Sequence, residues 1–374
     1  MKKTLVALAV AAVAATSANA AVVYDQDGSK VEVGGSLRLL LTKNSGERGD
    51  LKNKGSRVVI KGSQDLGNGL SALGNVEVRF EGNKGDDFGD IETKRLFAGF
   101  KQDGVGQLTF GRQLTNADDL GLSDYTYDLG GVNQTTTSGR KVAKFTSAEW
   151  NGFKFGLDYI FDNDAKQDSA QNRGWGASVF YTADLGSDIT YNFSGGFTQD
   201  KYKKQTISEA TTINIPNAAG DIVTVPGSIR TSVPDHKENA FIVSSELVTG
   251  PFAISVDYSQ RKSTNDANVI KYRAFSDTVS VANFNKITEI GLGMKYSYLE
   301  NASVYGEYIW GQGKLAKVAA DVADKANLRA WILGTDYKLH KNVVTYLEGG
   351  SFKYKYASNK NTDNYAGVGL RVYF

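Results

Sequence analysis

The last ten residues, 365–374, constrain the fold of this chain more than any other stretch. They read YAGVGLRVYF, in which every second residue from Ala366 to Phe374 is apolar and the alternate residues are small or polar. Successive side chains of a β-strand point to opposite faces, so the pattern predicts a strand with one wholly apolar face. A strand in this place must pair with one already formed. Pairing with the first strand would close a barrel and remove both free edges.

The same two-residue alternation recurs along the whole chain. Its cleanest example is 252–261, where Phe252, Ile254, Val256 and Tyr258 alternate with small or polar residues. We predict sixteen antiparallel strands, joined in turn by short turns and long polar loops. The strands are 31–41, 57–63, 72–81, 94–101, 107–113, 141–150, 153–161, 175–183, 189–199, 240–247, 252–261, 287–298, 303–310, 328–339, 343–355 and 365–374.

Alternating short turns and long loops are typical of a transmembrane β-barrel, whose greasy face meets lipid. The four prolines fall in loops or turns and interrupt no strand. No stretch after residue 20 has the roughly 18 apolar residues that a spanning helix needs. The alternative is a soluble β-sandwich, which would bury its apolar face against a second sheet.

Residues 1–20 have the layout of a cleaved signal peptide: Lys2 and Lys3, an apolar run over 5–15, and a small-x-small site at Ala18 and Ala20. The predicted mature chain, 21–374, is one barrel domain. Losing two lysines from 43 basic residues leaves 41 against 41 acidic residues, and this neutrality argues against nucleic acid as a partner. The lack of cysteine excludes a disulfide scaffold and thiol chemistry.

Three stretches depart from the alternation. Residues 200–239 are predicted to form a long exposed surface loop, and the spacing of apolar residues in 314–327 predicts one or two helical turns. The third stretch, 114–139, has no basic residue before Arg140 and carries four acids, Asp118, Asp119, Asp124 and Asp128. A sixteen-stranded barrel encloses a water-filled lumen. If this loop folded into the lumen, it would narrow the channel and make it selective.

Support for catalysis is weak. The chain has two histidines, His236 and His340, and neither an HExxH nor a GxSxG motif. Asp124 and Asp128 could form a glycosidase pair, but acids in such a loop act more often through their charge. We therefore expect no enzyme activity, no metal site and no cofactor.

On these features the sequence resembles the general, non-specific porins of Gram-negative outer membranes, and most closely the OmpH-like major porins of the Pasteurellaceae. The resemblance runs from VVYDQDGSKVEVGG at 22–35 to GVGLRVYF at 367–374. In such porins the loop after the fifth strand forms the constriction and carries an aspartate and then a PEFGG-type turn. DLGLSDYTYDLGG at 119–131 occupies that place: Asp124 matches the aspartate and Asp128 the glutamate, while Tyr127 and Leu129 replace the proline and phenylalanine.

The resemblance also implies a basic cluster on the wall opposite the loop. The candidates are Arg38, Arg57, Arg79, Lys144 and, on the fourth strand, Lys94 or Arg95. The fourth-strand choice stays open because Phe97 and Gly99 look like its outward residues. On the lipid face a basic residue would cost about 2–4 kcal/mol at mid-bilayer, which favours the inward orientation.

The implied function is an outer-membrane diffusion porin for ions and small hydrophilic solutes, with acids and bases across a narrow water-filled opening. The implied partners are lipid, lipopolysaccharide, the barrel-assembly machinery and two further copies of the chain. Asp86 and Asp87 of the 82–90 loop, with Arg112, would latch the trimer, and Phe374 would be the assembly signal. An alternative class is a surface adhesin or host-factor binder acting through 200–239, and a third is an outer-membrane enzyme.

Overall fold

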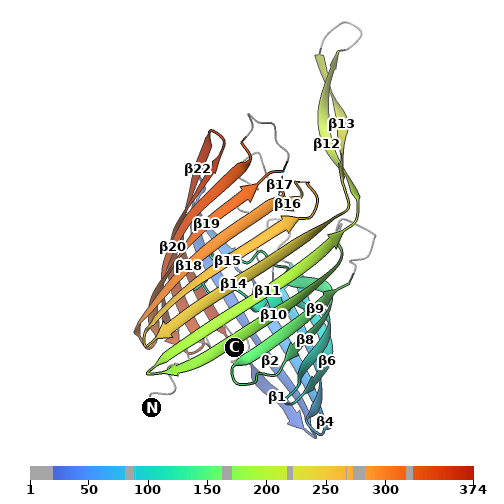
Figure 1. Cartoon of the computed structure of the whole chain (residues 1–374). Coiled ribbons are helices and arrows are strands. Elements are labelled where there is room, and N and C mark those ends of the chain that lie inside the picture. The colour runs from blue at the N-terminus through green and yellow to red at the C-terminus, as the bar shows by residue number, and fades with distance from the viewer. Residues whose placement is uncertain are drawn as a thin grey trace.

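The computed structural model describes residues 20–80, 88, 90–161, 171–216, 222–266, 268–272, 283–316 and 323–374. Its main sheet closes into a barrel of 16 antiparallel strands, which confirms the predicted fold (Figure 1). The barrel strands are β2 (Ser29–Asn44), β4 (Ser56–Gly67), β5 (Leu70–Phe80), β6 (Ile91–Gln102), β7 (Gly106–Leu114), β8 (Ser138–Ser147), β9 (Phe153–Ile160), β10 (Gln171–Gly186), β11 (Ile189–Tyr202), β14 (His236–Thr249), β15 (Phe252–Ser263), β18 (Lys286–Leu299), β19 (Ala302–Lys314), β20 (Lys325–His340), β21 (Val343–Tyr356) and β22 (Asn359–Tyr373).

The barrel closes where the last strand meets the first long strand. β22 pairs with β2 from Ser36 opposite Tyr373 to Asn44 opposite Tyr365. Beyond this ladder, Phe374 N donates to Gly35 O (3.1 Å) and Gly35 N donates to Phe374 O (2.8 Å). The final residue therefore takes part in the closure that its alternating sequence predicted.

The outer face of the barrel is a band of exposed apolar side chains. On β22, Val368 and Leu370 are exposed while Gly367 and Gly369 on the other face are buried. Trp150, Phe153 and Phe252 lie beside the short turns, as aromatic girdles do in membrane barrels. A soluble protein rarely exposes so continuous an apolar surface, so this face is suited to lipid.

Short turns join the strands at one end of the barrel. At Asn151 and Gly152 both residues have positive φ (51° and 80°), the geometry of a tight two-residue hairpin turn. A similar turn at Asp27 and Gly28 joins β2 to a strand that the sequence reading missed, β1 (Ala21–Gln26). The Asp-Gly pair was the signal that could have revealed it. A further short strand, β3 (Asp50–Asn53), pairs with β2 in the connection between the first two predicted strands.

The long connections lie at the other end. Most of the predicted 200–239 surface loop is a hairpin of β12 (Gln205–Pro216) and β13 (Ile222–Val233), which rises above the rim as a ribbon (Figure 1). The long connection therefore lies outside the barrel, and its two sides pair as strands, which the sequence pattern did not predict. The middle of the stretch 314–327, for which helical turns were predicted, lies outside the described residues. The predicted signal peptide also lies outside them, except for its last residue.

The connection between β15 and β18 packs against the inside of the barrel wall. It carries the two-residue strands β16 (Ile270–Lys271) and β17 (Asn283–Phe284). Tyr272 and Phe284 are buried against inward side chains of β18 to β21, including Ile287 and Ile332. Among the described residues, no helix is long and apolar enough to cross a membrane.

Candidate functional site

The acidic loop between β7 and β8 folds into the barrel. It begins with a short 3₁₀ helix, η1 (Asn116–Asp119), and its neck is closed by Thr115 N donating to Thr137 O (3.0 Å). Asn116 N donates to both carboxylate oxygens of Asp158 on β9 (3.1 and 3.0 Å). We call residues 115–137 the inner loop.

Three wall carboxylates hold the inner loop across the lumen. Asp257 on β15 accepts hydrogen bonds from Leu122 N (2.9 Å) and Ser123 N (3.0 Å). Glu307 on β19 accepts from Gly131 N (3.0 Å) and Ser123 Oγ (3.0 Å), and Glu348 on β21 accepts from the backbone N–H groups of residues 127 and 128. All three acids are at most 3% exposed. Loop donors thus satisfy carboxylates that would be costly to bury alone.

The tip of the inner loop is fixed by Tyr127, the residue that replaces the proline expected from the resemblance. Its ring stacks on Tyr346 of β21, with centroids 4.4 Å apart and planes 11° apart. The Arg371 guanidinium lies 4.6 Å from the Tyr127 ring, and Tyr127 OH donates to Asp336 (2.8 Å). The tip therefore reaches β20 to β22, on the far side of the lumen from Asp158.

The loop acids occupy different environments. Asp128 pairs with Lys54 (Nζ to Oδ1, 3.0 Å), accepts from Tyr365 OH (3.0 Å), and has a side chain only 10% exposed. Asp124 accepts from the backbone N–H and hydroxyl of Thr126 (2.9 and 2.7 Å), yet remains exposed. Asp128 thus serves mainly to anchor the tip, whereas Asp124 presents its charge to water.

Asp118 and Asp119, both exposed, lie on η1 at the start of the loop. Asp118 interacts electrostatically with Arg79, Arg95 and Lys144. Asp118 therefore lies near basic residues of the wall.

Three of the predicted basic residues gather on the wall of β4 to β6 around one carboxylate, Glu77, which was not among the predicted site residues. Glu77 on β5 is contacted by Arg79 (2.6 Å), Arg95 (3.2 Å) and Arg57 (3.3 Å). Their side chains are 8–16% exposed. We call these four residues the arginine cluster. Glu77 alternates with outward valines on β5, and this parity was the available signal.

The remaining predicted bases lie around this cluster. Arg38 on β2 donates from Nε to Ser36 Oγ (3.0 Å), and Lys144 on β8 faces Asp158 across the ladder. On β6, Arg95 is paired with Glu77, whereas Lys94 falls in a β-bulge. Phe97 and Gly99 share the inward face with Arg95, so their assignment to the outside was wrong. The outward residues are Leu96 and Phe100, 56% and 51% exposed.

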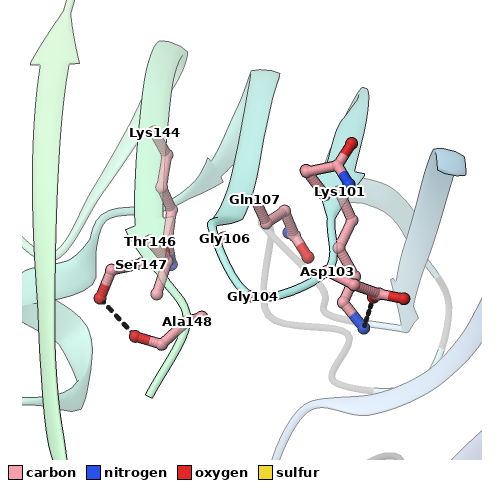
Figure 2. Close-up of a pocket in the computed structure, with 10 residues that line it drawn as sticks. Lys101, Asp103, Gly104, Gly106, Gln107, Lys144, Thr146, Ser147 and Ala148 are labelled. Atoms are coloured by element: carbon pink, nitrogen blue, oxygen red, sulfur yellow. Dashed lines mark hydrogen bonds and ion pairs between the residues drawn. The ribbon is translucent and has the colours of Figure 1, made fainter. Parts of the chain in front are cut away.

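The wall below the inner loop, near the short turns, contains a depression of about 410 Å³ (Figure 2). Lys101, Gln107, Lys144 and Thr146 line it, from β6, β7 and β8. Lys101 Nζ lies 3.8 Å from Asp103 (Figure 2) and Lys144 faces Asp158, so acids offset both charges. The depression therefore carries no unbalanced charge.

Of the residues predicted to latch a neighbouring copy, Asp86 and Asp87 lie outside the described residues. Arg112 Nη2 contacts Glu92 Oε1 of the same chain at 2.6 Å. The Phe374 ring lies beside Gly35, where an added Cβ would approach it to 2.8 Å.

Comparisons with known proteins agree with this geometry. A family model described as "Gram-negative porin" matches residues 7–369. Two proteins named "Major outer membrane protein" from Pasteurella multocida, one from strain Pm70, are 45% and 42% identical, each over 100% of both chains.

Solved structures share the fold at lower identity. OmpT of Vibrio cholerae superimposes with a TM-score of 0.69 at 20% identity, covering 94% of this chain and 99% of that one. An anion-selective porin from Comamonas acidovorans gives 0.67 at 18% identity, covering 92% and 100%. At such identities the likeness shows the fold alone.

Proposed function

This chain belongs to the Gram-negative porin family, and from that premise we propose that the gap between its inner loop and its arginine cluster is the selective constriction. The protein is an outer-membrane diffusion channel. The observation that carries the proposal is the inner loop itself, tied to β9 at its neck and to β22 near its tip. Such a loop divides the lumen, and the side that the loop leaves open is lined by arginines.

The charges on the two sides give the constriction its chemistry. Asp118, Asp119 and Asp124 present exposed carboxylates from the loop, while the wall opposite carries the arginine cluster and Arg38. Opposed charges across a narrow aqueous opening make a transverse field that orients dipolar solutes, while the aperture excludes large ones. Permeation is passive, and we propose that the protein does no chemistry on its solutes.

The test is a reversal-potential measurement on purified protein in planar bilayers under a salt gradient. Arg79→Gln and Arg95→Gln should each shift the potential toward cation preference. Arg329→Gln is the matched control, since Arg329 stacks on Trp310 (5.1 Å) away from the arginine cluster. An equal potential in all four proteins would contradict the placement of the constriction.

We also propose that the channel assembles as a homotrimer. A similar fold, OmpT of Vibrio cholerae, has been solved in a structure titled "trimer form". Conductance steps in groups of three would support this. Chemical cross-linking of the purified protein that traps no trimer, together with single conductance steps, would contradict it. The apolar band would then meet lipid and lipopolysaccharide where copies do not cover it, and β22 would present Phe374 to the barrel-assembly machinery.

The β12–β13 ribbon favours a second role at the cell surface, because it extends beyond the rim without lining the lumen (Figure 1). Replacing 205–233 by a two-glycine turn tests this role. Lost binding to host cells with unchanged conductance would support it, and unchanged binding would exclude it.

A further inference from the structure

We propose that Arg261 is a positioning residue that couples the external β12–β13 ribbon to the aperture beside the inner loop. Arg261 lies near the loop end of β15, and its side chain is 17% exposed. Its guanidinium contacts the inner loop on one side and the root of the ribbon on the other. The inference rests on the proposal that the gap beside the inner loop limits conduction.

On the loop side, Arg261 contacts the limb that returns to the wall. Its Nε donates to Gln134 O (2.8 Å) and its Nη2 donates to Thr136 Oγ1 (2.9 Å). Residue 136 belongs to the neck, since its carbonyl accepts from Thr115 Oγ1 (2.7 Å). Arg261 therefore holds the returning limb of the inner loop at the neck, and a displacement there shifts the part of the loop next to the wall.

On the ribbon side, Arg261 joins two acids that face each other across the ladder. Asp200 on β11 pairs in register with Glu238 on β14, just where these strands run on into β12 and β13. Arg261 Nη1 donates to Glu238 (2.9 Å), and its Nη2 lies 3.8 Å from Asp200. Facing carboxylates repel each other, and the guanidinium between them offsets this repulsion at the ribbon root.

The shape of the side chain matters as well as its charge. A guanidinium presents five N–H donors in a planar fork and can serve a carbonyl, a hydroxyl and a carboxylate at once. A lysine ammonium in the same place is a compact point charge that cannot reach both sides. The pair two rungs further along supports the root in another way, because the His236 ring stacks on the Tyr202 ring with centroids 4.7 Å apart and planes 6° apart.

A second wall residue limits how far the loop can move when Arg261 is changed. Glu289 on β18 accepts from Gln134 Nε2 (2.6 Å) and from Tyr272 OH of the connection between β15 and β18 (2.8 Å). The inner loop would therefore stay inside the barrel without Arg261, but with a freer neck. The expected change is in the steadiness of the aperture.

The experiment compares single-channel currents of wild type, Arg261→Gln, Arg261→Lys and the control Arg329→Gln. We expect Arg261→Gln to lose the single steady open level and to fluctuate among sublevels, Arg261→Lys to be intermediate, and the control to match wild type. If Arg261→Gln fails to assemble, Arg261→Lys carries the test. Steady wild-type currents in an assembled Arg261 variant, with only its thermal stability lowered, would overturn the proposal.

Coupling to the ribbon is tested by inserting an epitope between β12 and β13 and adding the matching Fab on that side. In the protein with wild-type Arg261, Fab binding should change the open-channel noise. In the Arg261→Gln protein, Fab binding should leave this noise unchanged. Equal block in both proteins would mean simple occlusion and would overturn the coupling. If the Arg79 and Arg95 variants still shift the reversal potential, the constriction itself stands.

Discussion

Replacing Glu77 by glutamine is the sharpest test of the electrostatics of this channel. Glu77 is the one acid within the arginine cluster, and it lies within 3.3 Å of a nitrogen of each of Arg57, Arg79 and Arg95. Its loss raises the formal charge of the cluster from +2 to +3 while keeping the side-chain shape. The field at the gap should therefore become more favourable for anions.

The size of the effect follows from Coulomb's law. One unit charge acts on an ion about 4 Å away with roughly 1 kcal/mol in water, and a Debye length of about 10 Å at 0.1 M salt reduces this to about 0.7 kcal/mol. An anion gains this amount and a cation loses it, so their difference changes by about 1.4 kcal/mol, or roughly tenfold in permeability ratio. At 1 M salt the Debye length of about 3 Å leaves only a two- to threefold change.

The assay is the reversal potential of Glu77→Gln at both salt concentrations. Glu300→Gln is the control. This change removes an equal charge, but Glu300 lies exposed in a turn at the far end of β18. An assembled Glu77→Gln channel with wild-type selectivity at 0.1 M, or a shift that does not shrink at 1 M, would refute the reasoning.

Three further predictions concern the loop and the closure. Asp124→Asn should increase anion preference more than Asp128→Asn, because Asp124 is exposed while Asp128 is neutralised by Lys54; equal reversal potentials would contradict this. Gly35→Ala should reduce the heat-modifiable folded form, since a Cβ would lie 2.5 Å from a backbone oxygen, whereas Gly62→Ala has open space and should fold normally. Phe374→Ala should lower the yield of assembled protein on heat-shift gels, and a normal yield would argue against the assembly signal.

The fold could be predicted from the sequence because lipid and water impose a period of two on every strand. Val368 and Leu370 are both exposed on the outer face of β22, as the alternation of the last ten residues predicts. The lengths of the strands were less predictable. Where β11 and β14 leave the membrane, their backbone ladder continues without a lipid-facing pattern, so the ribbon looked like a loop.

The site was predicted only in part, for a different reason. Arg57 and Arg79 have inward parity and charges that lipid would not tolerate, so sequence reasoning could place them. The choice between Lys94 and Arg95 stayed open, because the β-bulge at Lys94 shifts the alternation on β6. The partners of the inner loop could not be placed, because Asp257, Glu307 and Glu348 look like ordinary luminal polar residues. Their pairing with backbone N–H groups over 100 positions away depends on the path of the loop, which no local pattern specifies.

This pairing has a consequence for what the loop contributes to stability. Removing one donor while the loop remains leaves a buried carboxylate with one hydrogen bond fewer, at a cost of about 1–3 kcal/mol. Replacing 122–135 by a short Gly-Ser linker instead opens the wall to water, which can hydrate all three acids. We therefore expect the shortened protein to keep a closed, heat-modifiable barrel with a larger conductance. It should also be more cation-preferring, because Asp257, Glu307 and Glu348 would then face the permeating ions. A shortened barrel with unchanged or greater anion preference would show that these acids are not kept from the lumen by the loop.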